Sequence, residues 1–233
     1  MLQLLVLYGS RACEHDVSII TGVQALTAAD PMKYDVTPVY IDKQGRWFTG
    51  EALRRMDFYT HFDERQLIPC MLVPAPGGGA HLGTQKTGLI GGHGVPYTSA
   101  GVLGSATGMD KIAMKLIYRG CGLPVTDMCW FERADWEADR EDILGRVERE
   151  IGYPAFVKPA NLGSSIGISR AKDRASLAEA IDVAASFDRR ILVEKGVEHL
   201  KEVNCAAVGY GDADNVPPFE MPLSWDAFRT LDE

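Results

Sequence analysis

One stretch of the sequence has the residue types and spacing for binding a phosphate. Residues 156–169 read Phe-Val-Lys-Pro-Ala-Asn-Leu-Gly-Ser-Ser-Ile-Gly-Ile-Ser, so an apolar lead-in ends at Lys158 and a small loop with glycines and hydroxyls follows. Glycines let backbone N–H groups approach a phosphate closely, hydroxyls add donors, and a lysine supplies positive charge. The pattern predicts a β-hairpin whose loop covers a phosphate. The alternative is a plain hairpin turn with a solvated lysine.

This stretch differs from two common nucleotide-binding patterns. In a P-loop the glycines come first, a Lys-[Ser/Thr] pair follows and a helix opens. The G-x-G-x-x-G spacing of dinucleotide-binding folds is also missing here. The glycine-rich residues 76–88 have no periodicity, which predicts a flexible loop; a nucleotide-binding glycine loop there has no supporting pattern.

A second group of candidate residues follows the first predicted strand. Residues 2–8 are apolar almost throughout and predict a buried parallel strand, and a glycine turn then leads into a helix. Ligands of open α/β units lie at the carboxyl ends of such strands, where Glu14 and His15 occur. Alternatively, Glu14 only interacts with the helix dipole and His15 is solvated. The expected apolar face of this helix has Val17, Ile20, Val23 and Leu26.

A third group surrounds a carboxylate near the end of the chain. Residues 190–194 and 202–209 predict two strands joined by a linker that begins at Glu194. Backbone groups of such a linker can bind the edge of an adenine, and Glu202 can accept from ribose hydroxyls. Taken alone, Glu202 would by default be interpreted as a surface residue of a strand.

Further elements must position these groups. Pro38 indicates that the strand over 34–41 lies at a sheet edge. A helix opened by Met109-Asp110-Lys111 runs to about residue 119 and ends at glycines. Its expected apolar face has Ile112, Leu116 and Ile117. Other expected elements are strands at 70–74 and 94–98, a tight turn at 101–106, a strand start at 123–126, a charged helix over 139–151 and a helix with a capping box from residue 176.

Composition excludes several classes of protein. The chain has 233 residues, 46% apolar and 24% charged, as is ordinary for a globular protein. A net charge of −8 argues against nucleic acid as a partner. No apolar run reaches the roughly 18–20 residues of a membrane span, and the N-terminus lacks the basic flank of a signal peptide. Five cysteines without a CxxC pair predict no disulfide framework, which fits a reducing cytoplasm.

Together these segments resemble the D-alanine–D-alanine ligases of the ATP-grasp superfamily. The resemblance rests on five motifs in the family's order, at residues 10–18, 101–111, 156–169, 194–197 and 202–205. It implies an α/β N-terminal open parallel-sheet preATP-grasp domain over residues 1–108 and an incomplete, α+β ATP-grasp domain over residues 109–233. We place the domain boundary at the helix that Met109-Asp110-Lys111 opens.

The resemblance also implies a chemistry and a role for each site residue. ATP phosphorylates the carboxylate of one D-alanine, and the amine of a second attacks the acyl phosphate. By match, Glu14 binds the ammonium of the first D-alanine and Ser164 hydrogen-bonds to Glu14. The implied ATP-binding residues are Lys111 and Lys158 at the phosphates, Ser165 and Gly167 in the covering loop, Glu194 and Val197 at adenine, and Glu202 at ribose. Family members of this kind work in peptidoglycan-precursor synthesis, and a homodimer through the N-terminal domain is expected by resemblance only.

Two departures from the family pattern bear on activity. The His-Gly-x-x-Gly-Glu-Asp-Gly motif has no counterpart; its interval holds Gly91-Gly92-His93-Gly94, and His93 does not match the motif histidine. The sequence also stops at Glu233, before the part that carries the family's Mg²⁺ ligands, so Mg²⁺ is expected from the family while its ligands are absent. Two alternatives to the ligase therefore stay open: a nucleotide-binding remnant without catalysis, and another ATP-grasp carboxylate–amine ligase such as a D-alanine–D-lactate ligase.

Overall fold

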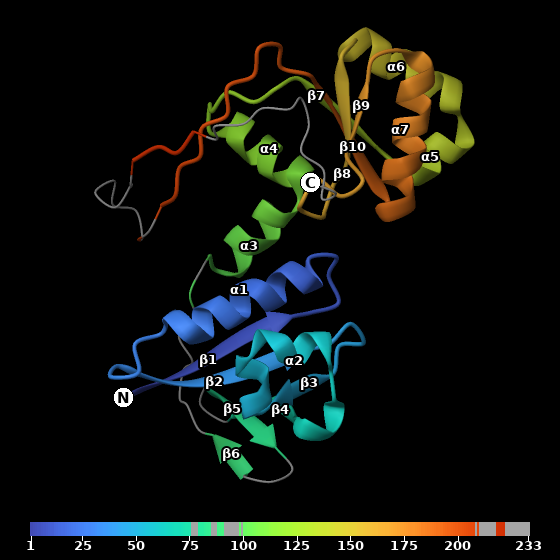
Figure 1. Cartoon of the computed structure of the whole chain (residues 1–233). Helices are drawn as coiled ribbons and strands as arrows, with labels where there is room; N and C mark the ends of the chain where they lie inside the picture. The colour runs from blue at the N-terminus through green and yellow to red at the C-terminus, as the bar shows by residue number, and fades with distance from the viewer. Residues whose placement is uncertain are drawn as a thin grey trace. The chain divides into compact units, whose positions relative to one another are not determined.

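The computed structural model describes residues 1–75, 79–84, 88–90, 98, 100–207, 209 and 218–221. The chain divides into two compact units, Met1–Ser99 and Ala100–Glu233 (Figure 1). Residues 79–84 and 88–90 form strands, so the flexible loop predicted over 76–88 is wrong for these residues. The rest of the segment at 76–94, the predicted strand at 94–98 apart from residue 98, and the end of the chain after 221 lie outside the described residues. The domain boundary that the sequence predicts, between residues 108 and 109, stays a prediction.

The first unit contains a six-stranded mixed sheet in the order β1-β2-β3-β4-β5-β6. β1 and β2 are parallel over their whole length, as predicted, and each later pair is antiparallel. The strands are β1 (Leu2–Gly9), β2 (Tyr34–Ile41), β3 (Trp47–Thr49), β4 (Ile68–Ala75), β5 (Gly79–Thr84) and β6 (Gly88–Ile90). The helices are α1 (His15–Ala28) and α2 (Met56–Thr60), with 3-10 turns at Glu51–Arg54 and Glu64–Gln66.

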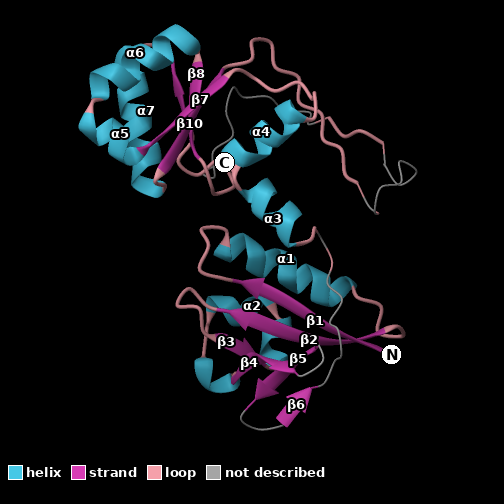
Figure 2. Cartoon of the chain, turned by 180° about the vertical axis from the view of Figure 1, so that it is seen from behind, coloured by secondary structure: helices cyan, strands magenta, loops and turns pink. Residues whose placement is uncertain are grey.

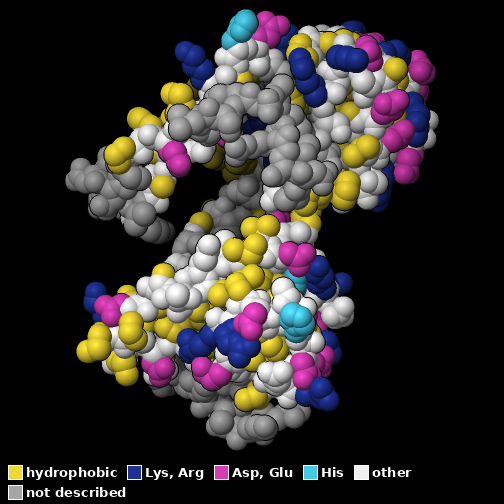
Figure 3. Space-filling model, viewed as in Figure 1, with side chains coloured by type: hydrophobic (Ala, Val, Ile, Leu, Met, Phe, Trp, Pro, Cys, Tyr) yellow, Lys and Arg dark blue, Asp and Glu magenta, His cyan; other side chains and the backbone are white. Residues whose placement is uncertain are grey.

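The burial of β1 and α1 differs from the prediction. Among the described strands β1, and not β2, lies at an edge of the sheet, and Leu2 and Leu7 are exposed. At Pro38, β2 pairs with a neighbouring strand on one side only, which is the side of β1. On its other side β2 pairs with β3, and that pairing begins at Tyr40. On α1, Ile19, Val23 and Leu26 are buried, whereas Val17 and Ile20 are exposed. Figure 3 shows hydrophobic side chains at the surface of this unit. The apolar stripe of α1 is thus narrower than its sequence indicates.

The second unit is built on a four-stranded antiparallel sheet in the order β7-β10-β8-β9. Its strands are β7 (Met128–Glu132), β8 (Ala155–Pro159), β9 (Ser169–Ala171) and β10 (Arg190–Lys195). Its helices are α3 (Val102–Met109), α4 (Lys111–Gly120), α5 (Arg133–Ala138), α6 (Arg140–Glu150) and α7 (Arg174–Phe187). The tight turn predicted at 101–106 is wrong, because Gly101 opens α3 and its carbonyl accepts from the N–H of Ser105. β7 begins at Met128, later than predicted.

The two faces of this second sheet differ in chemistry because side chains alternate along a strand. Val157, Ile191 and Val193 point toward α5, α6 and α7 and are fully buried in the larger apolar core. Figure 2 shows these helices on one side of the strands. The opposite face carries Lys158 on β8 and Glu194 on β10 beside a small apolar cluster of Ile112, Ala160 and Leu192. This second face therefore holds the candidate site.

Helix α4 buries one of its residues fully on that second face. Ile112 is buried, but Leu116 and Ile117, which the sequence also assigns to the apolar face, are exposed. Asp110 is the N-cap of α4, so the helix starts at Lys111, near the predicted start. Among the described residues no helix is long and apolar enough to cross a membrane.

Candidate functional site

The predicted hairpin around Lys158 is confirmed. β8 and β9 are antiparallel, with Phe156 opposite Arg170, and residues 160–168 form the loop between them. Ser164, Ser165 and Leu162 have positive φ angles of 51°, 58° and 85°, which non-glycine residues rarely adopt. Such backbone strain gathers at ligand-binding loops and persists only where the surrounding structure enforces it.

Both the backbone conformation and the close neighbours of Gly167 require a glycine at this position. Its φ is 70°, and a Cβ atom there would approach Phe187 Cδ2 and Pro159 Cγ to 2.8 Å. The loop thus folds back onto the end of α7 and the end of β8. The structure explains the second glycine of the motif by packing; its part in covering a phosphate stays a prediction.

Polar contacts fix the start of this loop. Asp188 accepts from the backbone N–H of Asn161 at 2.8 Å and from its side-chain amide at 3.0 Å. Burial acts to raise the pKa of Asp188, but the hydrogen bonds from Asn161 outweigh it, so the pKa lies below its ordinary value. The N–H of Ala160 donates to the carbonyl of Arg190 at 2.9 Å. The loop therefore leaves the sheet in a defined direction.

Lys111 is brought against the same loop. Its backbone N–H donates to the carbonyl of Ala160 at 2.8 Å, and its ammonium donates to the carbonyls of Pro159 at 3.2 Å and Leu162 at 2.6 Å. Asp110, the preceding residue, accepts from the N–H groups of Ile112 and Ala113, each at 3.0 Å. The structure thus places Lys111 beside the hairpin loop that follows Lys158.

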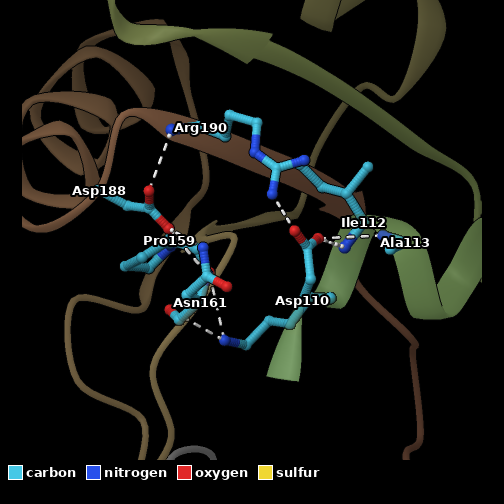
Figure 4. A network of polar contacts seen from close by, with 8 residues as sticks. Asp110, Ile112, Ala113, Pro159, Asn161, Asp188 and Arg190 are labelled. Carbon is cyan, nitrogen blue, oxygen red and sulfur yellow. Dashed lines mark hydrogen bonds and ion pairs between the residues drawn. The ribbon is translucent and has the colours of Figure 1, made fainter. Parts of the chain in front are cut away.

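An ion pair between Asp110 and Arg190 ties α4 to the sheet. Figure 4 shows Asp110 between the Arg190 guanidinium and the first N–H groups of α4. Arg190 is the first residue of β10, so the N-cap of α4 is fixed to the central part of the sheet. This contact was not predicted, although an aspartate before a helix is a recognisable N-cap signal.

Glu194 lies between two lysines. Its carboxylate pairs with the ammonium of Lys158 and, at 2.6 Å, with that of Lys115. Thr126 adds a hydroxyl that donates to Glu194 at 3.4 Å. Burial acts to raise the pKa of Glu194, but the charge of Lys158 and the hydrogen bonds from both lysines outweigh it and hold the pKa below its ordinary value. Glu194 is therefore an ionised carboxylate on the face of the sheet that carries Lys158.

The residues after β10 do not form the predicted second strand. Of residues 202–209, the described ones form no strand and make one isolated bridge, between Asn204 and Glu220. β10 already has β7 on one side and β8 on the other, so these residues have no open edge of β10 to pair with. Val197 and Glu202 are both exposed in this stretch. Their predicted contacts with adenine and ribose stay predictions.

In the first unit, the predicted strand–turn–helix that carries Glu14 is present. Glu14 is the N-cap residue of α1, and its carboxylate accepts from the Cys13 thiol at 3.1 Å. Ser164, its predicted partner, belongs to the second unit. The hydrogen bond between Glu14 and Ser164 stays a prediction.

His15 is not solvated, contrary to one of the two interpretations of the sequence. It is 3% exposed; its Nδ1 lies 2.6 Å from the carbonyl of Ser10 and its Nε2 lies 3.2 Å from the Tyr40 hydroxyl. A carbonyl only accepts, so Nδ1 carries a proton, and in the neutral ring Nε2 accepts from Tyr40. His15 thereby ties the turn before Glu14 to β2.

The described residues contain no group of three or more His, Cys, Asp or Glu side chains arranged to hold a metal ion. The carboxylates beside the lysines, Glu194 and Asp110, are each neutralised by a cation of the chain. These residues fit an anion, because lysines outnumber carboxylates around Glu194. They do not fit Mg²⁺, which prefers several oxygen ligands.

The fold is that of solved ATP-grasp ligases. The structure resembles the D-alanine–D-alanine ligase of Coxiella burnetii with a TM-score of 0.74 at 23% identity, over 91% of this chain and 68% of that one. It resembles the corresponding enzyme of Helicobacter pylori with a TM-score of 0.76 at 20% identity, over 96% and 75%. Both likenesses establish the ATP-grasp class of the fold.

Sequence comparison narrows this class to a family. The family models for the D-ala D-ala ligase N-terminus and C-terminus match residues 3–71 and 117–229. D-alanine–D-alanine ligase of Bacillus cytotoxicus is 36% identical over 236 positions, covering 91% of this chain and 65% of the relative. That of Bacillus pumilus is 36% identical, covering 99% and 77%. The chain belongs to the D-alanine–D-alanine ligase family.

The chain is shorter than the relatives it matches. It spans 65% of the length of the Bacillus cytotoxicus enzyme and 62% of that of Geobacillus kaustophilus. The alignment with the Bacillus pumilus enzyme has 279 positions, more than the 233 residues of this chain, so that relative has internal residues without a counterpart here. This agrees with the absence of the His-Gly-x-x-Gly-Glu-Asp-Gly motif from the sequence.

Proposed function

We propose that this chain binds ATP on the face of the second sheet that carries Lys158, and that it acts as a D-alanine–D-alanine ligase. The observation that carries the proposal is the gathering of lysines around the hairpin loop. Lys111 lies on the carbonyls of the loop, and Lys158 lies on the strand that leads into it. Fixed positive charge at such a place stabilises the charge that develops during phosphoryl transfer.

The residues would divide the work as follows. Lys111 and Lys158 hold the phosphates, and Ser165 and Gly167 belong to the loop that covers them. Glu194 and Val197 bind adenine, and Glu202 binds ribose. Glu14, with Ser164 as its hydrogen-bond partner, binds the ammonium of the first D-alanine. No side chain here needs to act as a general base toward the phosphoryl group, because positioning and charge carry that step.

The chemistry proposed is that of the family. The carboxylate oxygen of one D-alanine attacks the γ-phosphorus of ATP, which releases ADP and leaves an acyl phosphate. The amine of a second D-alanine then attacks the acyl carbon, and inorganic phosphate leaves as the peptide bond forms. Mg²⁺, when bound in this family, neutralises phosphate charge. A cytoplasmic location and a homodimer complete the proposal.

One observation favours a second candidate, a nucleotide-binding protein without ligase activity. The described residues offer no cluster of carboxylates for Mg²⁺. This candidate predicts ATP binding without turnover that depends on D-alanine.

The test is release of phosphate from ATP by the purified 233-residue chain, with and without D-alanine, together with mass spectrometry for the dipeptide. Lys158→Met is expected to abolish the signal, and Lys172→Met, which removes an exposed lysine of the same unit, is expected to leave it unchanged. Dipeptide formation supports the ligase. ATP binding without dipeptide supports the second candidate, and a chain that binds no ATP contradicts both. Adding D-lactate as the second substrate tests the D-alanine–D-lactate variant of the reaction.

A further inference from the structure

Lys115 belongs to the cluster around Glu194, although no motif of the sequence singles it out. It lies on α4, four residues after Lys111, and therefore on a similar side of the helix. Its ammonium lies 2.6 Å from Glu194 Oε2 and donates to the Thr126 hydroxyl at 2.7 Å. Its side chain is 14% exposed, against 22% for Lys158. Lys115 is thus the more deeply placed of the two lysines.

The cluster has one positive charge in excess. Two lysines face one carboxylate, and Thr126 is neutral. Burying a charge without a partner is unfavourable, so the cluster as it stands is suited to accept an anion. Lys158 and Lys115 differ in the partners that they have within the cluster. Lys115 has both Glu194 and Thr126 as partners inside the cluster, whereas Lys158 contacts Glu194 and the ring of Phe156, whose centroid lies 5.9 Å from its ammonium.

We infer that Lys115 is a positioning residue of the proposed nucleotide site: together with Thr126 it holds Glu194 in place, so that Lys158 can exchange Glu194 for a nucleotide phosphate. The inference rests on the proposed function, since it assumes that the anion is a phosphate of ATP. Without Lys115, Lys158 is the only charged partner of Glu194 within this cluster. Binding a phosphate would then break a pair that nothing replaces and leave a buried carboxylate uncompensated.

The four segments that supply the cluster all belong to the second unit. Lys115 comes from α4, Thr126 from the segment before β7, Lys158 from β8 and Glu194 from β10. The cluster is therefore complete within one compact unit. Its geometry also explains why Glu194 stays in place: the strand fixes its backbone between Met128 and Phe156, and Lys115 fixes its carboxylate from the helix side.

The experiment is equilibrium binding of ATP to the full chain by isothermal titration calorimetry. Lys115→Met is expected to weaken ATP binding at least about tenfold, as is typical when one partner of a poorly hydrated ion pair is removed. Lys115→Arg keeps the charge and is expected to stay within about threefold of the wild type. Lys172→Met removes an exposed lysine as the matched control and is expected to change nothing.

A double-mutant cycle separates positioning from direct contact with the nucleotide. In a Glu194→Gln background there is no carboxylate to hold, so adding Lys115→Met is expected to weaken ATP binding much less than it does in the wild type. An equal loss in both backgrounds would show that Lys115 binds the nucleotide itself and would overturn the inference. Unchanged ATP binding by Lys115→Met would overturn it as well.

A milder variant covers the case in which Lys115→Met does not fold. Thr126→Val removes one hydroxyl from the cluster and is expected to weaken ATP binding by about threefold; unchanged binding contradicts the inference. Failure of the proposed function is distinguishable, because the wild-type chain would then bind no ATP. Failure of the inference alone leaves wild-type binding intact while the variants bind equally well.

Discussion

The loop after β1 in the first unit and the loop after β8 in the second are held in different ways. The first is fixed by neutral groups: His15 bonds to Ser10 and Tyr40, and nearby Tyr8 and Tyr59 share a hydrogen bond of 2.6 Å. The second is held by charged groups: Asp188 accepts from the N–H of Asn161 at 2.8 Å, and the Lys111 ammonium donates to the Leu162 carbonyl at 2.6 Å. Beside it, the ion pairs of Asp110 and Glu194 hold α4 on the sheet. A neutral network keeps a loop in place without adding charge, whereas an ionic network can exchange partners with a charged ligand.

This difference matches the ligands proposed for the two loops. The polyphosphate of ATP needs cations that can change partners, and the second unit has them. The ammonium of D-alanine needs a carboxylate in a fixed place, and the buried His15 holds the residues that flank Glu14 without competing for it. Each prediction below tests one side of this comparison.

The largest effect is expected on the ionic side. Asp110→Ala removes the N-cap of α4 and leaves the Arg190 guanidinium, whose side chain is 24% exposed, without its carboxylate. We expect a loss of about 3 kcal/mol in the free energy of unfolding. Urea unfolding followed by circular dichroism measures it.

Asp139→Ala is the matched control for this change. Asp139 caps α6 through the N–H of Asp142 at 3.0 Å, but it is exposed. Asp139→Ala should lower the free energy of unfolding by about 1 kcal/mol, the usual value for an N-cap alone. If the two variants lost the same free energy, the pair between Asp110 and Arg190 would contribute nothing, and the contrast between the two loops would be unfounded.

In the neutral network after β1, His15→Leu is expected to lower the free energy of unfolding by about 2 kcal/mol. The change leaves the Ser10 carbonyl and the Tyr40 hydroxyl without the imidazole as a partner. Tyr40→Phe removes only one of these hydrogen bonds and should cost about 1 kcal/mol. If the proposed function is right, His15→Leu also raises KM for D-alanine and leaves the Kd of ATP unchanged. A variant that weakened ATP and D-alanine equally would show that the two loops do not act separately.

The smallest effect concerns alkaline pH. Burial, and then the hydrogen bond to Tyr8, raise the pKa of Tyr59 above its ordinary value of 10.0. A folded-state pKa above the unfolded one means that the stability is fully present below pH 10 and is lost as pH rises beyond it, since the unfolded chain then releases the proton first. Between pH 8 and pH 10.5 the free energy of unfolding of the wild type should fall by roughly 0.8 kcal/mol more than that of Tyr59→Phe.

Urea unfolding at the two pH values, with both proteins in the same buffers, checks this expectation. Equal losses for wild type and Tyr59→Phe would mean that the Tyr59 hydroxyl titrates normally, and the neutral network would then be less buried than the structure has it.

The sequence by itself determined the local parts of this protein. The strand–turn–helix before Glu14, the hairpin around Lys158 and the start of α4 after Asp110 all follow from periodicity, glycine positions and capping residues, which act within a few neighbours along the chain. The family motifs lie in these parts for the same reason. That is why the fold class and the lysines of the proposed ATP site could be predicted.

Tertiary structure alone decided which residues became partners and which faces became buried. Lys115 and Glu194 are far apart in sequence, and only the packing of α4 on the sheet brings them together. His15 became buried because β2 places Tyr40 above it. Leu116 is exposed, and residues 202–207 form no strand. Neither outcome could be predicted, because apolar composition gives no information about whether another element covers a surface or leaves a strand edge open. Long-range contacts depend on topology, which no short stretch of sequence encodes.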